Sequence, residues 1–134
     1  MNGVVVRYTQ KDGDVVVVKP PVPLSDDAFE RMLSELVRHL RGAEPYGLVF
    51  DLTSAEMPSA LQRRRLSEHM RANQAAIRKN VRGLGVVATS TALRGVTTAV
   101  FWVFPPPVEW RTFDRVEDAK RWAQSCCVAV AEPV

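Results

Sequence analysis

Two groups of polar residues, each directly after an apolar segment, are the candidates for binding chemistry in this chain. They are Asp51, Thr53 and Ser54 in one group, and Ser90, Thr91 and Arg94 in the other. Hydroxyls, a guanidinium and the free N–H groups at a helix start all bind anions. Ligands of open α/β sheets lie beyond the carboxyl ends of parallel strands, so both groups are candidate contacts for a ligand or partner. The alternative is that the hydroxyls only cap helices and that Arg94 pairs with Asp51 or a surface carboxylate.

A third candidate is an apolar surface. The segment "VTTAVFWVF" places apolar residues on more than one side of a predicted helix, and its three largest are Phe101, Trp102 and Phe104. One helix against one sheet does not easily bury all of them. The excess is predicted to cover a homodimer interface, to line an apolar pocket or to meet a partner. The alternative is a core helix wrapped by the segment "PPPVEW" that follows.

Residue types typical of enzymes are isolated in this sequence. His39 and His69 lie on different predicted helices, with no second ligand at metal spacing. Cys126 and Cys127 are adjacent and form no C-x-x-C motif. There is no Gly-x-Ser-x-Gly elbow and no Walker-type loop. We therefore expect no enzymatic activity, no bound metal and no cofactor.

Hydrophobic periodicity and turn residues predict the element order β-β-α-β-α-β-α-β-α. Strands are predicted at residues 4–9, 15–19, 46–52, 83–89 and 109–113. Helices are predicted at residues 26–40, from 58 or 59 to beyond 77, at 91–104 and at 114–127. This alternation implies an α/β fold with a mostly parallel sheet, an N-terminal antiparallel hairpin and helices packed on the sheet. A chain of 134 residues is expected to be one domain, with a hairpin at 1–24, an α/β body at 25–127 and a tail at 128–134.

The second predicted helix carries much of the excess positive charge of a chain whose net charge is +3. Arg64, Arg71 and Arg78 repeat every seven residues and so share one side, while Arg63 lies at the edge of the opposite, apolar side. Asn73, within that apolar side, is predicted to tether a neighbouring loop. We interpret the arginine side as a helix face exposed to solvent. Binding of nucleic acid or of an anionic membrane is a weaker reading, because the interleaved aromatics of single-strand binders are missing.

The chain is expected to be cytoplasmic. The start, "MNGVVVRYTQ", lacks the basic and apolar regions of a signal peptide, and "VTTAVFWVFPPPV" is too short to span a bilayer. Adjacent cysteines rarely bond to each other, so no disulfide is implied.

Four segments carry a resemblance to a known family: the opening hairpin, "LVFDLTSA", "LGVVATS" and "FPPPVEWRTFDRVEDAKRWA". Together they resemble the STAS fold of sulfate transporters and anti-sigma-factor antagonists. The resemblance is strongest to small bacterial proteins described as SpoIIAA-like or STAS/SEC14-like, and it covers almost the whole chain. It implies a non-enzymatic binding or regulatory module, and some relatives of the wider fold bind lipids or other apolar ligands.

One family motif is absent. In the antagonists, the strand that resembles "LVFDL" leads to an Asp-Ser-Ser-Gly-type motif whose serine is phosphorylated by a kinase. The matching region here reads "TSAEMPSALQRRR", with Ser59 and Ala60 about where the acidic residue and the serine would be, and no Ser-Gly follows. The phosphorylation switch is therefore not expected, although Ser54 and Ser59 stay candidates for modification or partner contact.

The expected function is regulatory protein–protein association, with the chain itself as a possible partner in a homodimer. The alternative is a binder or carrier of a small apolar or amphipathic ligand, such as a lipid.

Overall fold

The computed structural model describes residues 4–9, 13–42, 45–103 and 105–131. Its strands are β1 (Val4–Tyr8), β2 (Asp14–Lys19), β3 (Tyr46–Asp51), β4 (Val81–Val87) and β5 (Trp110–Phe113). Its helices are α1 (Asp26–Leu40), α2 (Ala60–Ala72), α3 (Gln74–Asn80), α4 (Thr91–Val103) and α5 (Val116–Ala131). The predicted α/β class and the predicted alternation of strands and helices are confirmed.

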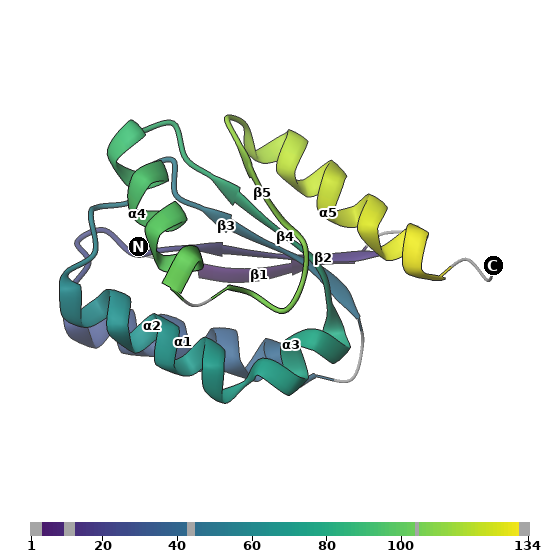
Figure 1. Cartoon of the computed structure of the whole chain (residues 1–134), viewed down its shortest axis with the longest axis horizontal. Coiled ribbons are helices and arrows are strands. Elements are labelled where there is room, and N and C mark those ends of the chain that lie inside the picture. Colours follow the sequence, from purple (N-terminus) through teal and green to yellow (C-terminus); the bar gives the residue numbers. More distant parts are fainter. Residues whose placement is uncertain (1–3, 10–12, 43–44, 104, 132–134) are drawn as a thin grey trace.

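The sheet has the order β1-β2-β3-β4-β5, with β1 and β2 antiparallel and the other pairs parallel. Because the order never reverses, right-handed crossovers carry each connecting helix over the same face. Figure 1 shows α1, α2 and α3 on that face, while α5, which follows the last strand, lies on the opposite face. The sheet therefore has no point of reversal, which is where open α/β sheets usually bind ligands.

Local signals place α1 and the hairpin as predicted. The Oγ of Ser25 accepts the N–H of Ala28 at 3.1 Å, and Asp26 and Asp27 occupy the first turn, where the helix dipole favours negative charge. Gly13 has a φ of 137°, the positive value expected in the hairpin turn. Asp12, its predicted partner in that turn, lies outside the described residues.

The single helix predicted beyond residue 59 is wrong, because α2 and α3 are separate helices that meet at Asn73. The Asn73 amide donates to the carbonyl of His69 at 2.8 Å and accepts from Nε of Arg41 at 3.0 Å. Asparagine side chains that bond to nearby backbone groups compete with the helix, which explains the break. The predicted tether is confirmed, since the bond to Arg41 links this break to the end of α1.

Several element boundaries also differ from the predictions by one or more residues, among them the start of β4 and the end of α5. Strand β4 begins at Val81, directly after α3, rather than at residue 83. Helix α5 continues to Ala131, so residues 128–131 of the predicted tail belong to it. Alanine is the strongest helix former, and "VAVA" contains no breaker that would end the helix earlier.

The two faces of the sheet are covered by side chains of different size. On the face of α1, core residues are large; they include Phe29, Leu33, Leu48, Phe50 and Leu84. On the face of α5, the core consists of valines of the sheet and of Ala119 and Ala123. Glycines bring α5 close, because a Cβ added at Gly47 would lie 2.6 Å from both the Cβ and the carbonyl oxygen of Ala123.

Candidate ligand-binding cleft

A cleft of about 360 Å³ lies on the large-residue face, between α2 and α4; we call it the α2–α4 cleft. Phe29 and Met32 of α1 and Phe50 and Val86 of the sheet form its inner surface. The prolines at 105–107 also line the cleft. Most of the lining is apolar, so the cleft is suited to an apolar group.

Helix α4 forms one wall of the cleft. Its lining residues recur at three- to four-residue spacing along one side and are Leu93, Val96, Thr97, Val100 and Phe101. The ring of Phe101 meets the edge of Trp110, with centroids 4.8 Å apart and planes at 73°. Helix α4 packs less closely on the sheet than α5 does, which leaves room for the cleft.

The opposite wall is α2, which adds polar groups at one edge. Leu66 and Met70 continue the apolar lining. Arg63, Ser67 and Arg71 follow one another at four-residue spacing, so they lie along one side of the helix, and all three line the cleft. The cleft is therefore amphipathic, with its polar groups concentrated on α2.

The start of α2 is held in place by Gln62, which is 5% exposed and fully bonded. Its Nε2 donates at 3.0 Å to the carbonyl of Leu24 and at 3.0 Å to Oδ1 of Asp26. Its Oε1 accepts the N–H of Ser59 at 2.9 Å, while the Ser59 Oγ accepts the Gln62 N–H at 3.0 Å. This capping box joins the start of α2 to the segment before α1.

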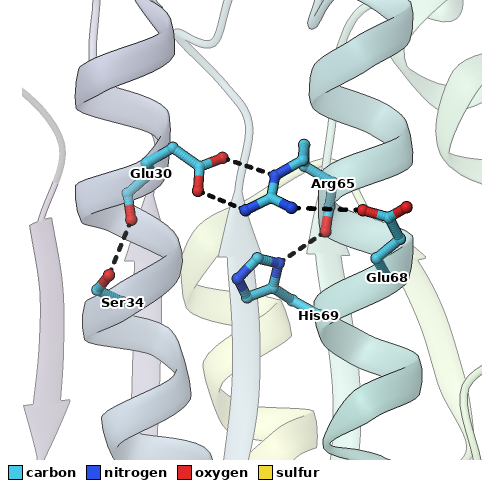
Figure 2. A network of polar contacts seen from close by, with 5 residues as sticks. All are labelled: Glu30, Ser34, Arg65, Glu68 and His69. Carbon is cyan, nitrogen blue, oxygen red and sulfur yellow. Dashed lines mark hydrogen bonds and ion pairs between the residues drawn. The ribbon is translucent and has the colours of Figure 1, made fainter.

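An ion pair between Arg65 of α2 and Glu30 of α1 links the two helices (Figure 2). Arg65 donates from Nη2 to Oε1 of Glu30 at 2.8 Å and from Nε to Oε2 at 3.1 Å. The hydrogen bond from Arg65 lowers the pKa of Glu30 below its usual value of 4.5. Arg65 also reaches Glu68 at 3.5 Å, and Nδ1 of His69 lies 2.9 Å from the Arg65 carbonyl.

The three consecutive arginines therefore point in three directions. Arg63 lines the α2–α4 cleft, as its predicted place at the edge of the apolar side suggested. Arg64 is exposed, as are Arg71 and Arg78, as predicted, but Arg71 also lines the cleft and Arg78 belongs to α3. Arg65 pairs with Glu30, a role that the sequence did not indicate. A rotation of about 100° per residue around a helix accounts for this division.

The first predicted polar group lies near the end of β3 and is bonded within its own turn. Oδ1 of Asp51 accepts from the Thr53 N–H at 3.1 Å and from the Thr53 hydroxyl at 2.7 Å. Ser54 is exposed, and Ser59 serves as the cap of α2. None of these four residues is among those that line the α2–α4 cleft. Their role as ligand or partner contacts stays a prediction.

The second predicted polar group lies at the start of α4. The Ser90 Oγ accepts the N–H of Leu93 at 3.3 Å, and Thr91 is exposed. Arg94 donates from Nε to the Ala88 carbonyl at 2.5 Å and pairs through Nη2 with Asp114. The expectation that a surface carboxylate would pair with Arg94 is confirmed, and the carboxylate is Asp114, not Asp51. This group also lies outside the lining of the α2–α4 cleft.

The three large apolar residues predicted to form an interface on α4 differ in their surroundings. Phe101 lines the α2–α4 cleft. Trp102, on the other side of α4, is 80% exposed. Phe104 lies outside the described residues. Of the apolar residues on α4, Val96, Val100 and Phe101 therefore line the pocket, while Trp102 is exposed.

Sequence reasoning did not find Ser67 or the inner surface of the cleft. Its lining comes from positions between Pro20 and Pro107, and no local motif joins them. The available signals were the surplus of apolar residues on α4 and the arginine at the edge of the apolar side of α2.

The remaining titratable residues do not gather into a site. Within the described ranges, no three His, Cys, Asp or Glu residues lie close enough together to hold a metal ion. Cys126 and Cys127 are free thiols, and burial raises the pKa of both. Burial lowers the pKa of His39, and the nearby Arg7 adds to this effect. A search of the same residues finds no helix with the length and apolar character to cross a membrane.

Comparison with known proteins defines the fold. No protein-family model matches the chain, and no curated protein matches it in sequence. It is similar to the crystal structure of an uncharacterised protein of the DUF3478 family with a SpoIIAA-like fold, from Shewanella loihica PV-4. The two chains are 16% identical, the match covers 91% of this chain and 94% of the other, and the TM-score is 0.62. This chain therefore has a SpoIIAA-like fold, as its resemblance to the STAS group predicted.

Proposed function

We propose that this chain is a non-enzymatic binding protein for a small apolar or amphipathic ligand, which it holds in the α2–α4 cleft. The observation that carries the proposal is the cleft itself, with about 360 Å³ of space lined mostly by apolar side chains. Pockets for small molecules have volumes of about 300–1,000 Å³ and combine an apolar lining with a few placed polar groups.

The packing around the cleft supports this proposal. Protein interiors are normally close-packed, and side chains beside a void lose dispersion contacts. Phe29, Phe50 and Leu93 border the cleft while being at least 92% buried from solvent. A ligand that fills the space would supply the missing contacts and stabilise the folded chain.

Native mass spectrometry of the purified protein tests the proposal. We expect a species heavier than the chain alone, whose extra mass is lost after extraction with an organic solvent. The extracted protein should then bind the neutral fluorescent probe N-phenyl-1-naphthylamine at one saturable site, and its melting temperature should rise with the probe concentration. A mass equal to the chain alone, together with no saturable probe binding, would contradict the proposal.

The second candidate function is protein association through α4, the role expected from the resemblance to STAS regulators. Its supporting observation is Trp102, which is 80% exposed. Tryptophan is enriched among the residues that dominate binding energy at protein interfaces. No residue in the described part of the chain covers this side chain. Experiment is needed to identify its partner, whether a second copy of the chain or another protein.

Size-exclusion chromatography with light scattering tests this second function. We expect the wild-type chain to form a dimer that Trp102→Asp weakens. Ala92→Asp places the same charge at an exposed position in the first turn of α4, ten residues from Trp102, and should leave the dimer intact. A monomeric wild-type chain that captures no partner would exclude association.

A further inference from the structure

We infer that the ligand of the α2–α4 cleft carries a single carboxylate beside one apolar chain or ring system, and that Arg63 and Ser67 bind the carboxylate. This inference rests on the proposed function, because it specifies the chemistry of the ligand for the same cleft. It does not use the polar groups predicted at the ends of β3 and β4.

Arg63 is a positioned guanidinium whose charge has no carboxylate partner among the described residues. Its Nη1 donates to the carbonyl of Pro58 at 2.8 Å, and both residues line the cleft. A guanidinium has five N–H donors in a planar fork, so one bond to a carbonyl leaves four donors for other acceptors. The neighbouring Arg65, by contrast, already binds the carboxylate of Glu30 at two points. A ligand carboxylate would give Arg63 the same kind of partner.

Ser67 supplies an independent observation. It is 5% exposed, it lines the cleft, and its hydroxyl has no hydrogen bond to any residue in the described part of the chain. It follows Arg63 by one turn on the same side of α2, at a separation of about 5–6 Å between Cβ atoms. With no partner in the described part of the chain, the hydroxyl keeps its donor and acceptor capacity for a ligand in the cleft. An oxygen of a carboxylate bound at Arg63 would accept a hydrogen bond from the Ser67 hydroxyl.

The charges around the cleft favour an anion over a cation. The lining contains the guanidinium of Arg63, unpaired with any carboxylate of the described residues, and one carboxylate, that of Glu56. The Oε1 of Glu56 is already engaged, since it accepts the N–H of Leu24 at 2.5 Å. The first turn of α2 has no acidic residue, so the positive end of its dipole adds to the same field.

The volume restricts the apolar part of the ligand. About 360 Å³ is near the lower end of the range of about 300–1,000 Å³ for small-molecule pockets. This space suits one medium-length chain or one compact ring system rather than the two chains of a diacyl lipid. The resulting class is a single-chain or compact ring carboxylic acid.

Three probes with the same chain and different heads test the inference on the wild-type protein: decanoate, decan-1-ol and decylamine. Each is titrated at neutral pH against bound N-phenyl-1-naphthylamine. Decanoate should bind at least about tenfold more tightly than decan-1-ol, because hydrogen bonds to charged groups are stronger than those between neutral groups. Decylamine should bind most weakly. Without a site for the anion, the order of the acid and the alcohol would be reversed, because the alcohol is more readily desolvated.

Two substitutions and one control test which residues produce the preference for decanoate over decan-1-ol. Arg63→Gln should weaken decanoate binding about tenfold and leave decan-1-ol binding unchanged. Arg64→Gln removes the same charge from the adjacent exposed position and should leave both affinities unchanged. Ser67→Ala should also weaken decanoate binding, by a smaller factor, and it tests the site separately should Arg63→Gln not fold.

The outcomes separate the inference from the proposed function. If neither the acid nor the alcohol displaces the probe, the proposed function fails. If the two bind equally, or if Arg63→Gln and Ser67→Ala both keep the full preference for decanoate, the cleft binds apolar ligands and the carboxylate inference is overturned.

Discussion

On one face of the sheet α5 lies directly against the strands, whereas on the other face α2 and α4 leave a cleft of about 360 Å³. The close face is built from glycines of the strands, such as Gly47, and from Ala119 and Ala123 of α5. The face with the cleft is built from larger residues such as Phe29 and Phe50. The distance between packed elements depends on the side chains at the contact, so small residues allow a close approach and large residues hold elements apart. One face therefore has no room for additional atoms, while the other has room for a ligand.

The largest expected effect is that of adding one carbon to the close face. The Cβ of Gly47→Ala would lie 2.6 Å from the Ala123 carbonyl oxygen and 2.8 Å from its carbonyl carbon. Backbone atoms cannot rotate away, so α5 must shift, and we expect the free energy of unfolding to fall by about 1–3 kcal/mol. Urea unfolding followed by circular dichroism measures this change.

Gly95→Ala is the control for this substitution. Gly95 lies within α4, and a Cβ there meets no atom within 4 Å. Alanine should therefore raise the free energy of unfolding by about 0.5–1 kcal/mol, the usual gain over glycine inside a helix. If Gly47→Ala and Gly95→Ala changed the free energy of unfolding equally, the proposed close packing of α5 on the sheet would be refuted.

A second, smaller effect on stability is expected when the cleft is filled. Val100→Phe adds a ring to a residue that lines the cleft, so we expect the free energy of unfolding to change by less than about 1.5 kcal/mol. The same variant should bind N-phenyl-1-naphthylamine at least about tenfold more weakly, because the ring occupies the space of the ligand. Calorimetry and probe titration measure the two quantities on one sample.

Ala99→Phe provides the matched control, because Ala99 is the adjacent, exposed residue of α4. Its added ring should point to solvent and leave probe binding unchanged. If Val100→Phe binds the probe as tightly as the wild-type chain does, the probe does not bind in the α2–α4 cleft.

The smallest expected effect concerns the ion pair that holds α2 against α1. The pKa of Glu30 is lowered in the folded chain from its usual value of 4.5, so the unfolded chain binds more protons near that pH. The pair therefore contributes its stability above about pH 4.5, and the contribution is lost as the pH falls through the lower, folded pKa. We expect a small loss, because the Arg65 and Glu30 side chains are 40% and 45% exposed and solvent screens the pair.

Urea unfolding at about pH 6 and about pH 3.5 measures this effect. Wild type should lose more stability between the two pH values than Glu30→Gln does. Arg65→Gln should remove the same difference, and the double variant should lose no more than either single variant. A wild-type pH dependence that survives in Glu30→Gln would assign it to other groups.

Parts of the fold that depend on neighbouring residues could be predicted. The spacing of apolar residues in α1 and the cap at Ser25 act within one or two turns of a helix, and both are as expected. The break at Asn73 was not predicted, although its bond to the His69 carbonyl is local; the partner that fixes the other end of this amide, Arg41, lies 32 positions away in the chain. The sequence did suggest that this asparagine bonds to a neighbouring segment.

The candidate site was predicted in part. The surplus of apolar residues on α4 indicated a pocket, a dimer or a partner, and Phe101 and Arg63 were singled out on the two helices that form the cleft. The polar groups at the strand ends were given more weight than the structure supports for this cleft, because that rule applies to sheets whose strand order reverses. Ser67 had no signal, since a serine within a helix is ordinary unless its surroundings are known.

The class of fold, the alternation of strands and helices and the outward position of Arg64 could be predicted from the sequence. These features follow from periodicity, turn residues and caps, which act over a few positions. The close packing of α5 on the sheet, the looser packing of α4 and the position of Arg63 and Ser67 in the cleft lining emerge only in the folded chain. Those outcomes depend on side-chain size and position across segments from Pro20 to Pro107, which meet only after the crossovers have folded.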